Sequence, residues 1–215
     1  MMSRFKPDPN WSSDRATAIV EHSLAEARDA LNALMARPGF ATSLAATGDL
    51  ISDALAAGGR VFSCGNGGSL CDAMHFAEEL SGRFRGDRPA LAAVAIADPA
   101  HLTCTANDYG YEAVFSRYLE AHGRPGDVLL AISTSGSSGN VVRAAETARS
   151  GEIKVVSLTG TQKSRLAALA DIDLCTPGGR FSDRVQELHI KAIHILIELI
   201  EARLFGAAAG DDPDT

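Results

Sequence analysis

The sequence lacks the long apolar runs and the excess of basic residues that typify several large classes of protein. No stretch approaches the roughly 18 apolar residues of a membrane span, and no apolar signal-peptide segment follows the basic N-terminus MMSRFKPDPNWSSD. With 20 basic against 27 acidic residues, the net charge of −7 argues against a broad surface for nucleic acid or anionic membrane. We therefore expect a cytoplasmic protein without nucleic-acid or membrane partners, in which any anionic ligand is held locally.

Paired cysteines and nucleotide-binding fingerprints are also missing. Four scattered cysteines show no CxxC spacing, which indicates neither a disulfide framework nor a thiolate zinc site. We expect them to be small buried apolar residues. No Walker A loop is present, and Leu70 stands where the dinucleotide fingerprint needs its third glycine. The sequence thus predicts no nucleotide cofactor.

What the chain does contain is an alternation of short apolar runs and helical patterns. Its 215 residues, 46% of them hydrophobic, suffice for one α/β domain. Helical spacing covers 13–35 and 40–57, and a last helix is expected over 182–205. Between them lie five candidate strands, at 60–64, 92–96, 127–132, 154–158 and 171–175. Strands that alternate with helices predict a parallel sheet covered on both faces.

The domain organisation expected from this pattern is simple. Residues 1–13 form an N-terminal extension, 14–205 form a single domain that begins with a helical pair, and 206–215 form a disordered tail. The sequence contains no internal repeat, low-complexity block or interdomain linker.

Two loops rich in small residues follow predicted strands and precede helices. In CGNGGS (64–69), backbone N–H groups at a helix N-terminus could receive an anion, although a tight connector without a ligand would have the same pattern. In STSGSSGN (133–140), hydroxyl groups lie beside glycines that let the backbone approach closely, a combination suited to a phosphate bound without lysine. Serine-rich loops can also be solvated turns, but two such loops in one sheet favour a ligand site.

Two helices carry candidate metal ligands. His75 and Glu79 are four residues apart and share a helix face, a spacing that suits a divalent ion but also an ordinary surface pair. Glu78 is rotated about 100° from Glu79, so we expect only one of these carboxylates to face the site. In the last helix, Gln186 and His194 lie about 80° apart around the axis, and His189 points away from both; a core histidine is the alternative.

Taken together, these segments resemble the phosphoheptose isomerase (sedoheptulose-7-phosphate isomerase) family of sugar-isomerase (SIS) domains. The matching stretches are CGNGGSLCDAMHFAEELSGRFR, AND (106–108), STSGSSGN and DRVQELHIKAIHILIELIE, in order, within a likeness that runs from about residue 14 to 205. The resemblance implies a three-layer, doubly wound α/β sandwich with a five-stranded parallel sheet. It also implies a homotetramer with active sites at subunit contacts. The implied reaction interconverts sedoheptulose 7-phosphate and D-glycero-D-manno-heptose 7-phosphate for the synthesis of nucleotide-activated heptose.

The same resemblance implies roles for individual residues. The phosphate loop would comprise Ser133, Thr134, Ser135 and Ser138. Contacts to the sugar would come from Asn66, Gly67, Gly68, Ser69, Asn107 and Asp108, with Glu79 and Gln186 as further substrate-binding residues. A zinc ion would be bound by His75, Glu79, Gln186 and His194. The sequence departs from the family at Leu70 and in PGGRFSDRVQE (177–187), and we expect these differences to affect substrate fit more than reaction type.

The geometry of a regular helix makes this ligand set demanding. Gln186 and His194 are about 12 Å apart along the helix axis, a long span for one ion. We therefore expect the ion to lie between extended side chains, or the helix to be distorted, or a neighbouring subunit to supply part of the set. One coordination position would remain open for a substrate oxygen.

The chemistry of an aldose–ketose isomerase fits these side chains. Moving a carbonyl from C2 to C1 requires a base that removes a carbon-bound proton and returns it to the neighbouring carbon, and we assign this role to Glu79. His194, with an ordinary pKa near 6.5, suits proton transfer to and from the sugar oxygens. A divalent metal could polarise the carbonyl. No redox cofactor is required.

Two other functions are compatible with parts of the pattern. A non-catalytic scaffold that resembles the DnaA initiator-associating protein would share the fold, but it would not need Glu79 and His194 together. A sugar-phosphate sensor would keep the two loops, but such domains are usually fused to a DNA-binding domain that 215 residues do not accommodate.

Overall fold

The computed structural model describes residues 6–179 and 181–206. Within these residues the chain forms a five-stranded parallel sheet and seven α-helices, with two short 3₁₀ helices at Tyr111–Ala113 and Ala167–Leu169. The strands are β1 (Val61–Cys64), β2 (Ala93–Ala95), β3 (Val128–Ser133), β4 (Lys154–Thr159) and β5 (Ile172–Cys175). The helices are α1 (Ser13–Met35), α2 (Phe40–Ala56), α3 (Gly68–Ser81), α4 (Pro99–Tyr109), α5 (Val114–His122), α6 (Gly139–Ser150) and α7 (Ser182–Phe205).

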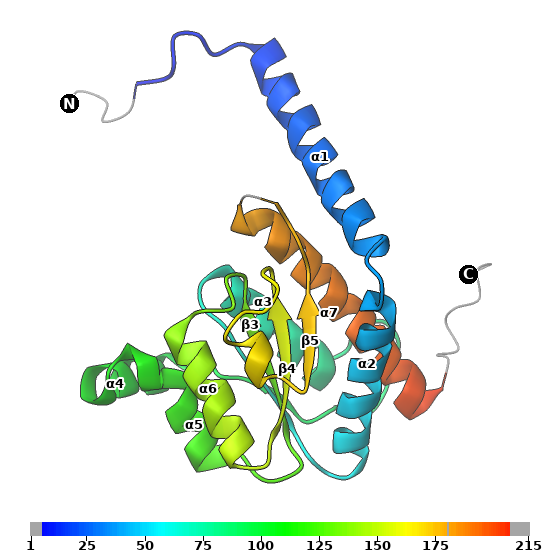
Figure 1. Ribbon diagram of the computed structural model, residues 1–215, viewed down its shortest axis with the longest axis vertical. Coiled ribbons are helices and arrows are strands. Elements are labelled where there is room, and N and C mark those ends of the chain that lie inside the picture. The colour runs from blue at the N-terminus through cyan, green and yellow to red at the C-terminus, as the bar shows by residue number, and fades with distance from the viewer. Residues whose placement is uncertain (1–5, 180, 207–215) are drawn as a thin grey trace.

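The sheet has the strand order β2-β1-β3-β4-β5, and every neighbouring pair is parallel. Its central strand, β3, is buried along its whole length because helices cover both faces. On one face, α2, α3 and α7 bury an apolar cluster that includes Ile51, Phe76 and Ile197. On the other, α5 and α6 pack over Phe62 and Leu129. Three layers around two apolar clusters confirm the predicted fold class (Figure 1).

The first helix stands apart from these layers. Ser12 begins it by accepting a hydrogen bond at Oγ from the backbone N–H of Arg15, which satisfies one free donor of the first turn. From there α1 extends away from the body of the domain (Figure 1). Helix α1 carries apolar side chains that remain exposed, namely Ile19, Val20, Leu24, Leu31 and Met35. In the single chain this apolar face has little to pack against.

The structure confirms most of the local expectations. All five strands, and the helices α1, α2 and α7, fall within one or two residues of their predicted bounds. The cysteines follow the expectation only in part, because Cys64 and Cys175 are buried whereas Cys71 and Cys104 are exposed; all four are free. Among the described residues, no helix combines the length and apolarity needed to cross a membrane.

The termini of the chain add little to this picture. Residues 1–5 of the predicted extension and 207–215 of the predicted tail lie outside the described residues.

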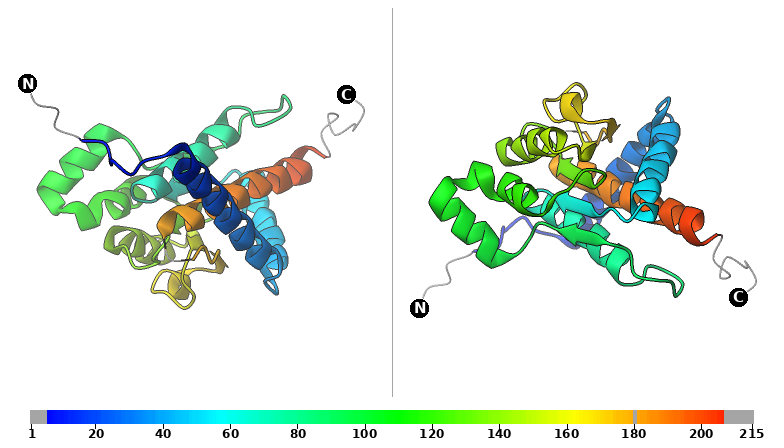
Figure 2. Two further views of the ribbon diagram at one scale, coloured as in Figure 1. Left: turned by 90° about the horizontal axis from the view of Figure 1, so that it is seen from above. Right: turned by 90° about the horizontal axis from the view of Figure 1, so that it is seen from below.

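The views in Figure 2 show that the loop between α3 and β2 lies on the same side of the molecule as the C-terminal half of α7. Ion pairs described below join these two segments.

Candidate active site

The strand order places the two loops rich in small residues at one point of the sheet. From β1 the chain passes to β2 on one side, whereas β3 lies on the other side of β1. In open parallel sheets, ligands bind outside the carboxyl ends of the strands at such a reversal of strand order. The glycine loop (65–67) leaves β1 and the serine loop (134–138) leaves β3, so both lie at this position.

The glycine loop needs its glycines for conformation and for close approach. Gly67 has φ of 56° and ψ of −123°, a backbone conformation that L side chains rarely adopt. At Gly68 a Cβ atom would lie 2.5 Å from Nε2 of Gln186, so only glycine lets this side chain approach the N-terminus of α3. The start of α3 is thereby brought against α7.

An amide pair connects the two loops. Asn66 donates from Nδ2 to Oδ1 of Asn140 at 2.8 Å, and Asn140 donates back to Asn66 at 2.9 Å. The Tyr111 hydroxyl donates to the same Asn66 oxygen at 3.0 Å. Asn140 is buried in the first turn of α6 and was not predicted from the sequence. Because Asn66 already has these partners, a sugar contact from it would use its backbone or its remaining amide hydrogen.

The serine loop forms a compact group of hydroxyls. Ser133 Oγ lies 3.1 Å from Ser138 Oγ and 3.5 Å from Ser135 Oγ, and it accepts a hydrogen bond from the backbone N–H of Gly136 at 3.1 Å. Ser138 occupies the N-cap position of α6 without making a side-chain capping bond, so its hydroxyl is not committed to the helix. Thr134 follows β3 directly. The four predicted phosphate-binding residues therefore lie together at a helix N-terminus, where an anion is favoured.

A second polar group lies between α3 and α7. His75 Nε2 is 3.0 Å from His194 Nε2 and 3.5 Å from Glu79 Oε1. The ligand atoms of a tetrahedral zinc site, with bonds of roughly 2.0–2.1 Å, lie about 3.3 Å from one another. The donor types suit zinc, and two candidate co-ligands, one from α3 and one from α7, lie within 3.5 Å of His75 Nε2.

The structure corrects our expectation about Glu78. Its carboxylate, like that of Glu79, contacts His75, but it lies 3.2 Å from Nδ1 rather than on the Nε2 side. Ligand atoms of His75, Glu78 and Glu79 lie within 4.8 Å of one another, so both carboxylates are near enough to share an ion with His75, although they contact different nitrogens of its ring. A carboxylate at the position of Glu78 can accept from Nδ1–H of a neutral imidazole, which would leave the Nε2 lone pair of His75 free to bind a metal.

Gln186, Asn107 and Asp108 lie apart from this histidine group. The side chain of Gln186 packs against Gly68, and Gly68 precedes His75 by seven residues of α3, about 10 Å along the helix axis. In one chain its position therefore favours a substrate contact, and its role as a metal ligand stays a prediction. Asn107 and Asp108 lie exposed at the end of α4, where their side chains hydrogen-bond to each other. Their proposed sugar contact also stays a prediction.

Burial sets the ionisation of three groups near the site. Partial burial, together with the neighbouring His75, lowers the pKa of His194, so its imidazole is neutral at physiological pH. Burial raises the pKa of Asp72, one turn before His75, to about 6, and its Oδ2 has no hydrogen-bond partner within the described residues. This carboxylate was not predicted from the sequence as part of the site. His189 lies in the core of the domain, and burial lowers its pKa to about 4.

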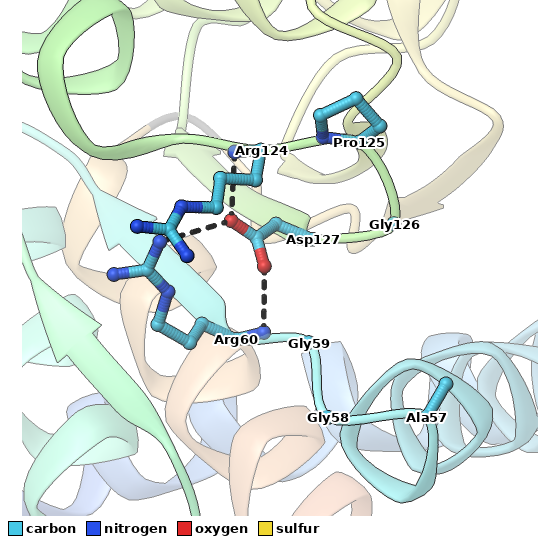
Figure 3. Close-up of a pocket in the computed structure, with 8 residues that line it drawn as sticks. All are labelled: Ala57, Gly58, Gly59, Arg60, Arg124, Pro125, Gly126 and Asp127. Atoms are coloured by element: carbon cyan, nitrogen blue, oxygen red, sulfur yellow. Dashed lines mark hydrogen bonds and ion pairs between the residues drawn. The ribbon is translucent and has the colours of Figure 1, made fainter.

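The opposite edge of the sheet holds a cavity of a different kind (Figure 3). It has a volume of about 240 Å³ and lies where β1 and β3 begin, lined by residues 57–60 and 124–127. The buried carboxylate of Asp127 accepts from the backbone N–H of Arg60 at 2.8 Å and from that of Arg124 at 2.9 Å. These bonds tie two strand beginnings together. Because the carboxylate is already paired, we assign this cavity a structural role.

The fold and the two polar groups define a class of sugar-phosphate-binding SIS domains, and comparisons with known proteins agree. The SIS domain family model matches residues 22–160. The phosphoheptose isomerase of Tolumonas auensis is 54% identical over 186 residues, which cover 86% of this chain and 97% of that protein.

Solved structures give the same result. Phosphoheptose isomerase from Neisseria gonorrhoeae has a TM-score of 0.75 at 36% identity, and one from Francisella tularensis has a TM-score of 0.76 at 33% identity. Each comparison covers 88% of this chain and 98% of the other. The chain belongs to the phosphoheptose isomerase family, as the sequence motifs indicated.

Proposed function

We propose that the protein is an aldose–ketose isomerase that interconverts sedoheptulose 7-phosphate and D-glycero-D-manno-heptose 7-phosphate and serves the synthesis of nucleotide-activated heptose. The observation that carries this proposal is that Nε2 of His75 lies 3.0 Å from Nε2 of His194 and 3.5 Å from a carboxylate oxygen of Glu79, so side chains of two helices meet at this imidazole. A scaffold needs no such group. The similarity to phosphoheptose isomerases over nearly the whole of their length supports the same conclusion.

Glu79 is the base in the proposed reaction. One carboxylate oxygen lies 3.5 Å from His75, and its side chain is only partly exposed. Glu79 would remove the C1 proton of the ketose to give an enediol and then return a proton to C2, which yields the aldose without any external oxidant or reductant. His194, neutral because its pKa is lowered, would pass a proton between the two sugar oxygens.

The proposed metal is zinc, bound by His75, Glu79 and His194, with Gln186 as the fourth predicted ligand. Support comes from the donor types and from spacings of 3.0 and 3.5 Å around His75 Nε2. When bound, a divalent ion supplies Lewis-acid stabilisation of negative charge on the sugar oxygens. Glu78, 3.2 Å from Nδ1 of His75, would favour the tautomer that carries its proton on Nδ1.

The phosphate group of the substrate is assigned to Ser133, Thr134, Ser135 and Ser138. These residues present hydroxyl groups at the N-terminus of α6, in a chain whose net charge of −7 offers little general attraction to anions. The sugar would then extend past Asn66, Gly67, Gly68, Ser69 and Gln186 toward Glu79. Such a path follows α3 over about 10 Å, from the glycine loop to His75.

We further infer that the chain forms a homotetramer with active sites at subunit contacts. Two features support association: the exposed apolar face of α1, and the position of Asn107 and Asp108, whose hydrogen bonds do not reach the site in one chain. A neighbouring subunit could supply the missing sugar contacts. Native mass spectrometry would test the tetramer directly, and a monomer at micromolar concentration would contradict it. The cytoplasmic location stays a prediction from the sequence.

The reaction itself is tested with sedoheptulose 7-phosphate in D₂O, followed by NMR. We expect an aldoheptose 7-phosphate that carries solvent deuterium at C2, because the carboxylate exchanges its proton before returning it. Dephosphorylated sedoheptulose is the matched control and should react far more slowly, since it cannot use the serine loop. If purified protein forms no aldoheptose phosphate, with or without added zinc, the proposed function is wrong.

A further inference from the structure

Arg88 makes an unusual set of contacts in the loop that follows α3. Its guanidinium donates from Nη2 to the carbonyl of Glu79 at 2.6 Å, and from Nη1 to the carbonyls of Leu80 at 2.7 Å and Gly82 at 3.0 Å. A longer bond reaches the carbonyl of Pro89. The last turn of a helix leaves its carbonyls without internal partners. Arg88 therefore supplies the donors that terminate α3.

The same guanidinium also reaches α7. Its Nε donates to Glu201 Oε1 at 2.7 Å, and the two side chains are only 5% and 13% exposed. A planar guanidinium presents donors in several fixed directions, which a lysine ammonium cannot reproduce. Arg88 is thus a three-way junction between the end of α3, the loop after it and α7.

These are the two helices that carry the candidate site. Glu201 follows His194 by seven residues, two helical turns, so both lie along one stripe of α7. Arg88 bonds the backbone of Glu79 itself, four residues after His75. The junction and the 3.0 Å contact between His75 and His194 therefore link the same pair of helices one to two turns apart.

We propose that Arg88, together with Glu201, is a positioning residue that holds the C-terminal turn of α3 on α7 and so keeps His75 and Glu79 aligned with His194. It touches none of the three side chains and acts through the Glu79 backbone and the register of the two helices. The effect on turnover rests on the proposed isomerase activity, whereas the effect on metal affinity does not.

The test compares Arg88→Lys with Arg85→Gln. Arg85 lies in the same loop and pairs with Glu198 of α7 at 2.5 Å, but both side chains are about half exposed, so it controls for the loss of a loop-to-α7 ion pair. We expect Arg88→Lys to lower kcat about 10- to 100-fold and leave KM within about threefold, because the serine loop belongs to other elements. Arg85→Gln should leave both within about twofold.

A second readout is independent of turnover. Cobalt(II) replaces zinc as a spectroscopic probe, and we expect its affinity to fall about 10- to 100-fold in Arg88→Lys, as is typical when groups that orient metal ligands are removed. If Arg88→Lys does not fold, Glu201→Gln, which keeps the size of the side chain and one acceptor oxygen, is measured in the same way. Should wild-type protein bind cobalt without isomerising the sugar, the proposed function fails, and the titration still tests the positioning role.

The result that would overturn the inference is equally specific. A folded Arg88→Lys protein, or Glu201→Gln in its place, with wild-type kcat and wild-type cobalt affinity would show that the junction only terminates a helix. A parallel loss in Arg85→Gln would show that any contact between the loop and α7 matters, and would likewise remove the special role of Arg88.

Discussion

Two polar groups in this molecule differ in how completely their atoms are paired. At the amino edge of the sheet, buried Asp127 accepts hydrogen bonds from two backbone N–H groups, and its cavity gathers no further converging carboxylates or histidines. Between α3 and α7, His75 lies close to both His194 and Glu79, and all three side chains are partly exposed. Paired groups stabilise a fold, whereas converging groups with spare lone pairs can bind a metal or move a proton. The more evident cavity is therefore not the better candidate site.

The largest expected effect is a loss of turnover when Glu79, in the group between α3 and α7, is changed. Glu79→Gln keeps the size of the side chain but removes the base, so we expect kcat to fall by at least about 100-fold. Steady-state kinetics with sedoheptulose 7-phosphate measures this change, and thermal unfolding should show little loss of stability. Turnover close to that of wild type would contradict the assignment of Glu79.

The serine loop provides the next largest effect. Ser138→Ala removes a hydroxyl from the N-terminus of α6, and the loss of one hydrogen bond to a charged phosphate should raise KM about 10- to 100-fold with a smaller change in kcat. Ser137→Ala, in the same exposed loop, is the control and should change KM by less than about threefold. Equal effects of both variants would mean that the loop, and not the phosphate contact, determines KM.

A change at Asp127 should have the opposite result, with reduced stability and unchanged turnover. Asp127→Ala leaves two part-buried backbone N–H groups without their acceptor, which costs about 1–3 kcal/mol in the free energy of unfolding. We expect kcat of the folded variant to equal that of wild type. Urea unfolding provides the measurement, with Glu120→Ala, at an exposed ion pair, as a control that changes stability by less than about 0.5–1 kcal/mol. An Asp127→Ala protein that loses turnover but keeps its stability would contradict the structural role assigned to Asp127.

The smallest effect concerns His189, which shares α7 with His194 but is fully buried. Burial lowers its pKa to about 4, so the unfolded chain, where histidine titrates near 6.5, binds the proton more readily. Stability is then unaffected above about pH 7 and decreases as the pH falls from about 6.5 to 4. In His189→Leu this decrease should be shallower by about 1–2 kcal/mol at pH 5, as measured by unfolding at several pH values. Identical pH profiles would show that His189 does not contribute.

Much of the fold could be predicted because it follows from patterns within short segments. Apolar runs separated by helical stretches identified the strands, and apolar residues at helical spacing identified the helix that begins at Ser13. The two loops rich in small residues were also placed correctly at strand ends. In these cases the backbone conformation depends on neighbouring residues, which the sequence displays directly.

Several site residues could not be predicted in this way. Asn140 and Tyr111 orient Asn66, and Glu78 contacts His75 from the opposite side of the ring to Glu79. The prediction that only one of Glu78 and Glu79 faces the site was wrong. Their long side chains reach different nitrogens of the same His75 ring, although their positions around the helix differ by about 100°. Arg88 looked like one basic residue among several in the loop GRFRGDRP, and no periodicity distinguishes it from Arg85.

The sequence by itself determined the succession of strands and helices along the chain, the two loops and the residue types available for chemistry, since each depends on local spacing. Only the tertiary structure decided which of those residues meet. His75 and His194 are 119 positions apart, and Arg88 and Glu201 are 113 apart, so their contacts depend on how α3 and α7 pack on a common sheet. That packing also placed Gln186 against Gly68 rather than beside the histidines, because the eight residues that separate it from His194 extend along a straight helix.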